Sequence, residues 1–156
     1  MDYYNPNDVY DALLRQDALR TVLDSWLDTP FRHFCGIKKI GVDCTHFVAK
    51  VFHEVGLIEQ IRIPQYFKED YFLHNNSSVL LDAVKAHLNV EPVGKTNPQI
   101  GDIAFYRYGK SDYAHASIFY DREHAYQAVN RMGVQKIHWK HKLWFPRLTE
   151  IYRIKE

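Results

Sequence analysis

The spacing of the apolar residues changes about two-thirds of the way along this chain of 156 residues. Before Pro98, apolar residues recur every three to four positions, which is the period of an amphipathic helix. After Pro98, short runs rich in aromatic and β-branched residues follow one another, which is typical of strands. Helices followed by strands predict an α+β domain with an antiparallel sheet. The length fits one domain, which we expect over residues 1–156.

Three helices and about five strands are expected. The helices are predicted over residues 1–30, 43–56 and 77–88, with loops at 31–42 and 57–75. The strands all lie within residues 100–154, at 102–108, 114–120, 124–129, 135–139 and 150–154. Asn7 or Asp8 is the expected N-cap of the first helix. Asp43 is the expected N-cap of the second helix, and Gly56 is its expected end.

The charge balance and the hydropathy exclude several classes of protein. Lys and Arg number 20 against 19 Asp and Glu, which gives a net charge of +1, so we expect no nucleic-acid partner. No apolar run approaches the roughly 18 residues of a transmembrane helix, so we expect no integral membrane segment. The N-terminus, MDYYNPNDVY, is acidic and polar where a secretory signal would be basic and then apolar. We therefore expect synthesis without a signal peptide.

The chain has two cysteines, Cys35 and Cys44, beside nine histidines. Two cysteines do not make a disulfide scaffold, and we expect both to be free thiols. Cys44 follows Asp43 at or next to the first helical position, where the partial positive charge of the helix terminus favours a thiolate. Backbone N–H groups at that end can also receive an oxyanion. Cys44 is therefore a candidate nucleophile with a lowered pKa; the alternative is a small buried thiol without chemistry.

Among the nine histidines, His115 has the best position for a catalytic base. It opens the predicted strand 114–120, where a side chain can be aimed rigidly at a helix N-terminus. His46, two residues after Cys44, lies about 200° around the helix and therefore points away from the thiol. The other histidines have no obvious partner and are expected to be solvated or packed.

A catalytic imidazole also needs a group that orients it. If Asp121 heads a short hairpin turn, His115 stands directly opposite Gln127 on the next strand. Gln127 can then accept the second ring N–H and fix the tautomer of the imidazole. A register change of one residue would bring Ala128 to that place instead.

Four segments together resemble the NlpC-type cell-wall peptidases. GVDCTHFVAKVFHEVGL resembles the nucleophile motif of the family, Gly-x-Asp-Cys-Ser-Gly-Phe-Val before a helix that ends near Gly-Leu. IGDIAFYR is similar to the Gly-Asp-x-x-x-Phe strand, and AHASIFY to the His strand that follows it. AYQAVNRMGV has Gln127 where the family has its third polar residue. DTPFRHF also resembles the Thr-Pro-Tyr motif that precedes the cysteine.

This resemblance implies a papain-like fold and a cysteine peptidase that needs no metal or cofactor. Cys44 would be the nucleophile, His115 the general base and Gln127 the orienting residue. The N-terminus of the Cys44 helix would supply part of the oxyanion hole. The implied substrate is the stem peptide of peptidoglycan, cut between D-glutamate and a diamino acid.

The resemblance also implies three substrate-binding positions. Asp43 and Thr45 flank the cysteine as the family's Asp and Ser do, and those residues help to bind a free amine of the substrate. Phe31 stands in place of the Tyr whose hydroxyl often lies near the catalytic cysteine. His46 replaces a small residue, and Gln127 stands where His is commoner. A neutral amide orients an imidazole but does not stabilise the imidazolium electrostatically.

The stretch from Ile61 to Phe72 and the expected lack of a signal peptide also resemble phage-encoded or prophage-encoded members of the family. We therefore expect synthesis in the cytoplasm or a place in a phage particle. A phage tail is then one candidate delivery partner, and the cell wall is the expected site of action.

Three other functions stay open on the sequence. Zinc would use two His and two Cys, namely His33, Cys35, Cys44 and His46, but their spacings are tighter than usual. A papain-like domain without activity would be a tail or wall-binding module, with a surface formed by WKHKLWF and the aromatic residues Tyr66, Phe67, Tyr71 and Phe72. The same thiol chemistry also serves amidases and acyltransferases that act on other substrates.

Overall fold

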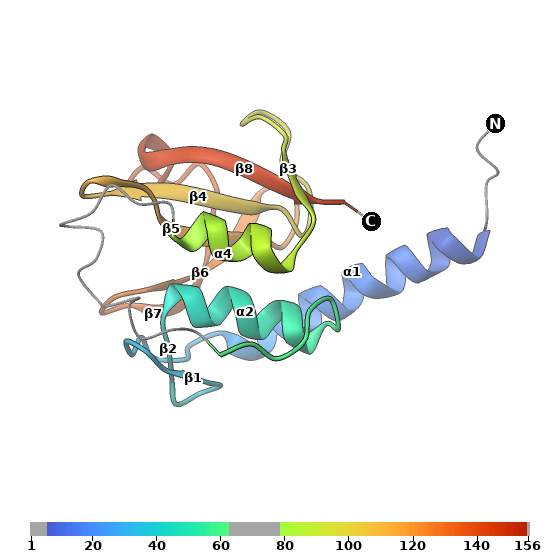
Figure 1. Cartoon of the computed structure of the whole chain (residues 1–156), viewed down its shortest axis with the longest axis horizontal. Coiled ribbons are helices and arrows are strands. Elements are labelled where there is room, and N and C mark those ends of the chain that lie inside the picture. Colours follow the sequence, from blue (N-terminus) through green and yellow to red (C-terminus); the bar gives the residue numbers. More distant parts are fainter. Residues whose placement is uncertain (1–5, 63–78, 156) are drawn as a thin grey trace.

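A six-stranded antiparallel sheet forms the centre of the protein, in the order β3-β8-β4-β5-β6-β7 (Figure 1). The computed structural model describes residues 6–62 and 79–155, with side chains from residue 12 onward. The strands of this sheet are β3 (Val90–Pro92), β4 (Ile103–Tyr108), β5 (Ser111–Phe119), β6 (His124–Val129), β7 (Gly133–His138) and β8 (Leu148–Ile154). A smaller sheet pairs β1 (Gly36–Ile37) with β2 (Gly41–Val42). The helices are α1 (Pro6–Trp26), α2 (Cys44–Glu54), α4 (Val79–His87) and the short 3₁₀ helix η1 (Phe145–Arg147).

The predicted α+β arrangement is confirmed, and three details differ. The sheet has six strands rather than about five, because β3 pairs with β8 at its edge. A strand of three residues that ends in proline has no alternation for a sequence pattern to reveal. The stretch 31–42, expected to be a loop, contains the hairpin of β1 and β2. The expected loop 57–75 extends into residues 63–78, which lie outside the described residues.

The second predicted helix has the boundaries that its caps indicate. Asp43 is the N-cap of α2, with an extended backbone, and its side chain accepts a hydrogen bond from the backbone N–H of His46. At the other end, Gly56 adopts φ +81°, and its N–H donates to the carbonyl of His53. The N–H of Leu57 donates to the carbonyl of Phe52, which completes a Schellman motif. The cap pattern therefore fixes which residue begins the helix, and that residue is the cysteine.

The first helix differs more from its prediction. It begins at Pro6, before either expected cap, since proline is favoured at a first helical position. Its C-terminal half is anchored by Leu19, Leu23 and Trp26, which are buried in the main core. Leu13, which has the spacing of the same apolar stripe, is 55% exposed because α1 extends beyond the body of the protein at that point (Figure 1). None of the helices in the described part of the chain is long and apolar enough to cross a membrane.

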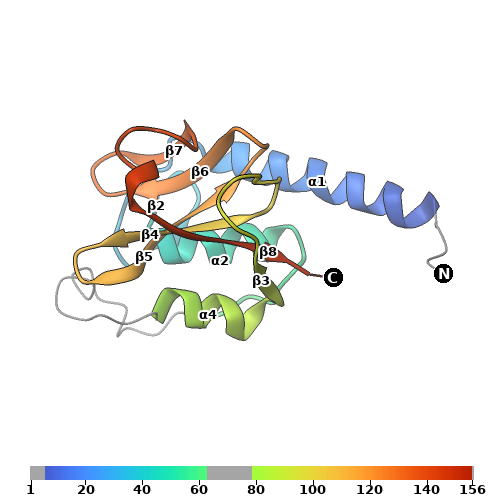
Figure 2. The same ribbon diagram turned by 90° about the horizontal axis from the view of Figure 1, so that it is seen from above.

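The two faces of the sheet belong to different cores. On one face, Phe105, Ala116, Ile118, Tyr126 and Ala128 pack with buried residues of α1, α2 and α4. Among these helices, α2 and α4 both contact β5, and α1 packs on α2. Figure 2 shows α2 and α4 next to each other and α1 extending away from the body of the protein. On the other face, a smaller core is formed by Ala104, Tyr106, Phe119, Ala125, Trp139, Leu148 and Ile151, with Trp144 packed against it. The alternation along the strands thus separates a helix-covered face from a face covered by the segment between β7 and β8.

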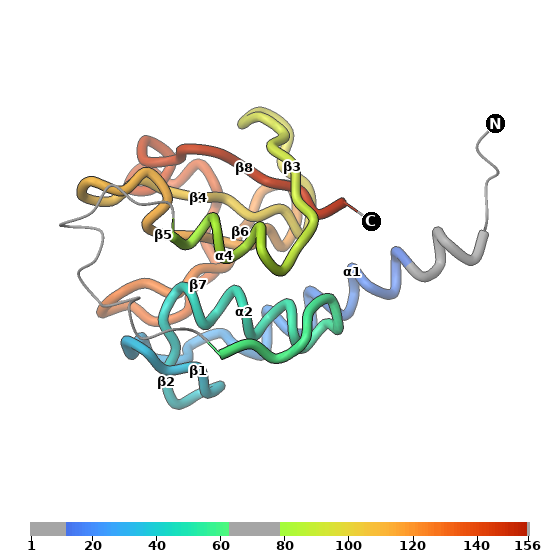
Figure 3. The backbone as a smooth tube through the Cα atoms, in the orientation of Figure 1, coloured from blue at the N-terminus to red at the C-terminus, as the bar shows by residue number. Residues whose placement is uncertain are grey.

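The sheet opens between β5 and β6. β4 and β5 pair over most of their length, whereas β5 and β6 pair at Ile118 with Tyr126 and at Phe119 with Ala125. β5 continues back to Ser111 and β6 continues forward to Val129 beyond this short ladder. α2 packs against both strands, and Figure 3 shows the chain passing through β1 and β2 directly into this helix. The first turn of α2 and the open part of the sheet are therefore neighbours.

Candidate active site

Asp43 fixes the N-terminus of α2 and the segment that precedes it. One carboxylate oxygen, Oδ1, accepts from the backbone N–H of His46 at 2.8 Å, and the other, Oδ2, accepts from that of Phe34 at 2.7 Å. The imidazole Nδ1 of His46 lies 2.9 Å from Oδ1, and its ring meets the ring of Phe34 edge-on, with centroids 5.3 Å apart. Asp43 itself is 6% exposed. These contacts hold Cys44 as the first residue of the helix.

The thiol of Cys44 faces β5. Its Sγ lies 4.0 Å from the carbonyl oxygen of Ala114, the residue before His115. Although the residue keeps partial exposure, burial raises the pKa of the Cys44 thiol to about 12, and the negative charge of Asp43 acts in the same direction. Hydrogen bonds from the Thr45 hydroxyl and from the backbone N–H groups of Cys44 and Thr45 oppose this rise in pKa. The expectation that the helix terminus lowers the pKa is therefore wrong for the resting site, because desolvation outweighs it.

His115 and Gln127 form a buried pair across the opening of the sheet. His115 Nε2 lies 2.7 Å from Gln127 Oε1. Because this amide oxygen can only accept, Nε2 carries the proton and Nδ1 keeps the lone pair that a base needs. Gln127 is fully buried, and His115 is 8% exposed. The predicted contact between the two side chains is thus confirmed.

The register behind this contact differs from the prediction. The pair Phe119 with Ala125 shifts the ladder by two residues, so His115 is not directly opposite Gln127. A shift of two residues keeps every side chain on its face, and the two side chains meet diagonally instead. β5 also begins at Ser111, so His115 lies within the strand rather than at its start.

Trp144 covers the imidazole, and sequence reasoning did not find this contact. Its ring stacks on the ring of His115 with a centroid distance of 4.8 Å and an interplanar angle of 30°. Tyr106, opposite His115 on β4, lies 5.6 Å from the same ring and shares a hydrogen bond of 2.9 Å with Ser117. Trp144 belongs to WKHKLWF, which predicted a surface or a core segment, and no spacing linked it to a residue 29 positions earlier.

These surroundings make His115 a weak base at rest. Burial lowers the pKa of the His115 imidazole to about 4, although the hydrogen bond to Gln127 acts in the opposite direction. With the pKa of Cys44 raised, thiol and imidazole are both neutral between about pH 4 and pH 12. No direct hydrogen bond joins Cys44 to His115 among the described residues. Transfer of a proton between the two groups would therefore require the side chains to move or a water molecule to bridge them.

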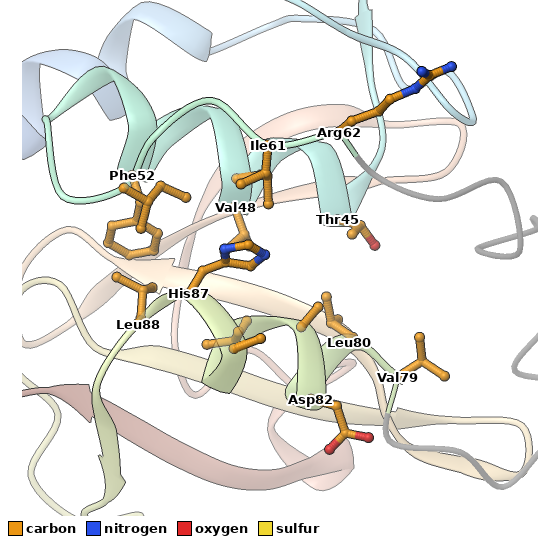
Figure 4. Close-up of a pocket in the computed structure, with 15 residues that line it drawn as sticks. Thr45, Val48, Phe52, Ile61, Arg62, Val79, Leu80, Asp82, His87 and Leu88 are labelled. Atoms are coloured by element: carbon orange, nitrogen blue, oxygen red, sulfur yellow. The ribbon is translucent and has the colours of Figure 1, made fainter.

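The predicted substrate-binding residues lie around the first turn of α2, and their roles stay predictions. Both carboxylate oxygens of Asp43 already accept hydrogen bonds from the protein. Phe31 packs against the main core and forms an isolated bridge with Val42. Thr45 lines a largely apolar pocket of about 450 Å³ between α2 and α4. Figure 4 shows Thr45 at one end of this pocket and Phe52 at the other.

The residues considered for zinc are engaged in other contacts. His46 is paired with Asp43, and the ring of His33 lies against that of Phe34. Cys35 and Cys44 are both free thiols. Across residues 6–62 and 79–155, no three His, Cys, Asp or Glu side chains are grouped so that they could hold a metal ion. The backbone carbonyl of Cys35 accepts a hydrogen bond of 3.2 Å from the N–H of Asp43, in the segment that leads into α2.

Comparison with known proteins supplies independent evidence. The fold is similar to that of an NLP/P60 family protein from Staphylococcus aureus subsp. aureus Mu50, described as similar to lipoprotein, with a TM-score of 0.61 and 13% identity. That match covers 99% of this chain and 44% of the other. An NlpC/P60 family protein from Bacillus cereus ATCC 10987 has a TM-score of 0.61 and 18% identity, over 88% of this chain and 39% of the other. The chain thus spans less than half the length of either protein.

At these identities the two solved structures establish the fold. A search of curated proteins finds no match. The sequence model of the NlpC/P60 family, however, matches residues 28–153, which include the cysteine helix and the whole sheet except one terminal residue. On this evidence, the chain belongs to the NlpC/P60 family.

Proposed function

We propose that this protein is a cysteine peptidase that hydrolyses amide bonds in peptidoglycan stem peptides, between D-glutamate and a diamino acid. The observation that carries the proposal is the buried His115–Gln127 pair beside a thiol at a helix N-terminus. NlpC/P60 proteins are generally cell-wall peptidases, which supports a hydrolase of the cysteine peptidase class. The cell wall is then the proposed site of action.

The reaction begins with a proton transfer from Cys44 to His115. Nδ1 of His115 takes the thiol proton, because Nε2 is already bonded to Gln127. The sulfur attacks the carbonyl carbon of the substrate amide and forms a C–S bond. The oxygen becomes an oxyanion that the backbone N–H groups at the start of α2 stabilise. Gln127 keeps the imidazole in the tautomer that this step requires.

The second half of the reaction restores the enzyme. The imidazolium of His115 gives its proton to the leaving nitrogen, the C–N bond breaks and a thioester remains on Cys44. Water then loses a proton to His115 and attacks the thioester, and the C–S bond breaks with return of the thiol. No metal or cofactor takes part in either half of the proposed reaction.

The raised pKa of Cys44 and the lowered pKa of His115 determine how the nucleophile is activated. A neutral pair holds no standing thiolate, so proton transfer accompanies attack on a bound substrate rather than preceding it. This arrangement protects the resting thiol from alkylation and oxidation, since thiolates are the reactive form. In a permanent thiolate–imidazolium pair the sulfur is always reactive, whereas here the reactivity of Cys44 depends on a bound substrate.

Digestion of purified peptidoglycan tests the proposal. The wild type is expected to release two kinds of fragment, which mass spectrometry identifies. One kind ends at a D-glutamyl residue, and the other begins at a diamino acid. Cys44→Ala is expected to release none, whereas Cys35→Ser serves as the matched thiol control and should release the same fragments as the wild type. Identical fragments from Cys44→Ala and the wild type would show that the mechanism is wrong.

An inactive wall-binding module would also have a neutral Cys44 thiol and a neutral His115 imidazole. Binding to peptidoglycan and its cleavage are therefore measured together. Sedimentation of the protein with peptidoglycan, without release of any fragment by the wild type, would favour the module. Cleavage of a non-peptide amide or ester with no action on peptidoglycan would favour an amidase or acyltransferase.

A further inference from the structure

The segment that connects β7 to β8 is strongly basic. Residues 124–149 hold five of the 20 Lys and Arg residues of the chain and none of its 19 Asp and Glu residues. Within the segment 139–147, Lys140, Lys142 and Arg147 are all exposed. The net charge of +1 therefore conceals an uneven distribution, in which one stretch of the surface is cationic.

The end of β4 and the turn after it add two cations to the same region. Arg107 and Lys110 are exposed on either side of Tyr108, whose ring centre lies 5.1 Å from the guanidinium carbon of Arg147. β4 also packs against η1, so the turn and the basic segment adjoin each other. Across residues 6–62 and 79–155, no acidic side chain forms an ion pair with any of these five cations.

Acidic residues border this region, and the segments 107–110 and 139–147 themselves contain none. Asp112 follows the turn after β4, and the backbone carbonyl of Glu123 accepts from the N–H of Trp139 at 2.9 Å. Glu150 already accepts a hydrogen bond of 2.9 Å from the hydroxyl of Tyr113. Positive charge exceeds negative charge here even when these three carboxylates are counted.

Large apolar side chains are exposed among the cations. Leu143 is 61% exposed, Tyr108 is 42% exposed and Phe145 is 40% exposed. The Phe145 ring meets that of Trp139 edge-on, with centroids 5.4 Å apart, and Nζ of Lys140 lies 5.2 Å from the centre of the same indole. Because Trp139 belongs to the smaller core, this buried ring holds an exposed cation and an exposed aromatic side chain together.

The backbone holds these side chains on a tight turn. The N–H groups of Trp144 and Phe145 both donate to the carbonyl of His141, at 3.0 Å and 2.9 Å. Pro146 stiffens the 3₁₀ helix that follows, and Leu148 after it is buried in the smaller core. Groups on an anchored turn lose little conformational freedom when they bind a partner.

We propose that residues 107–110 and 139–147, the basic-apolar surface, bind the anionic headgroups of a lipid bilayer. The cations pair with the headgroup phosphates, and Leu143 and Phe145 enter the boundary between headgroups and acyl chains. A soluble anionic polymer would satisfy the cations and leave the apolar side chains without a partner, whereas a bilayer interface satisfies both. Cys44, His115 and Gln127 lie outside this surface, so the proposal does not rest on the peptidase activity.

Sedimentation with lipid vesicles tests the proposal. Vesicles of equal parts phosphatidylglycerol and phosphatidylcholine are compared with vesicles of phosphatidylcholine alone. The wild type is expected to bind the anionic vesicles more than about tenfold more tightly, because each cation near the anionic surface adds to the affinity. Raising the salt concentration from 0.1 to 0.5 M should weaken this binding through screening. Equal binding to both kinds of vesicle, or binding to neither, overturns the proposal.

Paired substitutions show whether these cations are the ones that bind. Lys140→Gln combined with Lys142→Gln should weaken binding to the anionic vesicles about twentyfold, the expected loss for two surface cations. Lys85→Gln combined with Lys155→Gln removes the same charge near the opposite end of β8, where Nζ of Lys85 lies 5.4 Å from the ring centre of Tyr152. This control should keep the wild-type affinity. Equal losses in the two double variants would mean that net charge, rather than this surface, determines binding.

A change of apolar area without a change of charge separates a bilayer from an anionic polymer. Leu143→Ser should weaken binding to the anionic vesicles about fivefold, since it removes a side chain that would leave water on binding. Leu13→Ser is the matched control, because Leu13 is 55% exposed on α1, and it should bind as the wild type does. Wild-type affinity in Leu143→Ser, with a loss in the Lys140 and Lys142 double variant, would assign the surface to an anionic polymer and overturn the bilayer.

The vesicle experiment is independent of the peptidase proposal. Cys44→Ala should bind the anionic vesicles as the wild type does, although it is expected to release no fragments from peptidoglycan. Failure to cleave peptidoglycan therefore leaves the bilayer proposal in place, and failure to bind vesicles leaves the peptidase proposal in place. Losses in both surface variants, with wild-type affinity in both controls, support the assignment.

Discussion

The thiol and the imidazole of the candidate site are positioned in two different ways. Cys44 is fixed by residues close to it in sequence, namely Asp43, His46 and Phe34, through a helix cap and one ring contact. His115 is fixed by residues from separate elements: Gln127 on β6, Tyr106 on β4 and Trp144 before η1. One half of the site is local and the other half is tertiary.

This difference indicates which substitutions would disturb each half of the site. The cap and helix terminus around Cys44 form whenever α2 forms, and their contribution is electrostatic. The position and the pKa of His115 depend on three elements packing correctly, so a substitution far away in sequence can change the base without touching the thiol. Substitutions in each half should therefore give different signatures in activity, pH dependence and alkylation.

The largest effect is expected when the base itself is removed. His115→Gln should reduce kcat for peptidoglycan cleavage by about a thousandfold, because no other described group is placed to accept the thiol proton. The measurement is the initial rate of fragment release at pH 7. His124→Gln is the matched control, since His124 is a neighbouring sheet histidine bonded to Asp121 at 3.1 Å. A rate within tenfold of wild type in His115→Gln would mean that the base is another residue.

A smaller loss is expected when the base stays but its orientation is released. Gln127→Leu keeps the volume of the buried side chain and removes the acceptor for Nε2, so the imidazole no longer has one fixed tautomer. We expect kcat to fall about a hundredfold while the circular dichroism spectrum is unchanged. Unaltered kcat with lowered thermal stability would show that Gln127 has a structural role alone.

The local half of the site is what the sequence could predict. A residue that caps a helix, a cysteine after it and a glycine at its end are neighbours in the chain, and their positions follow from backbone geometry alone. The strand assignments from β4 to β8 also follow from aromatic and β-branched runs. The face shared by His115 and Gln127 was predictable for the same reason, although the register was two residues off.

The tertiary half depended on information that spacing does not contain. The short ladder between β5 and β6, which opens the sheet at His115, lies where α2 packs against both strands, and no strand signal in the sequence predicts it. Trp144 reaches His115 because the segment after β7 folds back across the sheet. The pKa of Cys44 is raised rather than lowered for the same reason. The sequence reveals the helix terminus, which lowers the pKa, but it does not reveal the burial that raises it. Contacts of this kind arise only when the whole chain is folded.

Removing the indole that covers the His115 imidazole should change the pH dependence of the activity more than its maximal rate. In Trp144→Leu the His115 ring gains contact with water, so its pKa should rise from about 4 toward the usual value of 6.5. The neutral, proton-accepting form then predominates only above a higher pH, and activity at pH 5 relative to pH 7 should fall about tenfold. The pH profile of kcat/KM measures this.

Trp139→Leu is the control for the loss of an indole, since Trp139 packs against Phe119 in the same core, with ring centres 6.0 Å apart. It should lower stability without moving the acid limb of the profile. An acid limb that stays in place in Trp144→Leu would show that the stacked indole is not what lowers the pKa of His115.

The smallest effect is expected in the local half, from a change of charge without a change of cap. Asp43→Asn keeps an oxygen for the N–H of His46 and a good N-cap, and it removes the negative charge that raises the pKa of Cys44. It also replaces the oxygen that accepts from the N–H of Phe34 with an amide group, so a circular dichroism spectrum and a thermal melt accompany the measurement. More thiolate is then present at any pH below the pKa, so alkylation of Cys44 by iodoacetamide at pH 8 should become a few times faster. The rate is measured in a Cys35→Ser background, where Cys44 is the remaining thiol.

Because burial is the larger cause of the raised pKa of Cys44, the increase in the alkylation rate must stay modest. A hundredfold increase would mean that Asp43, rather than burial, controls the thiol, and an unchanged rate would mean that its charge is not felt at the sulfur.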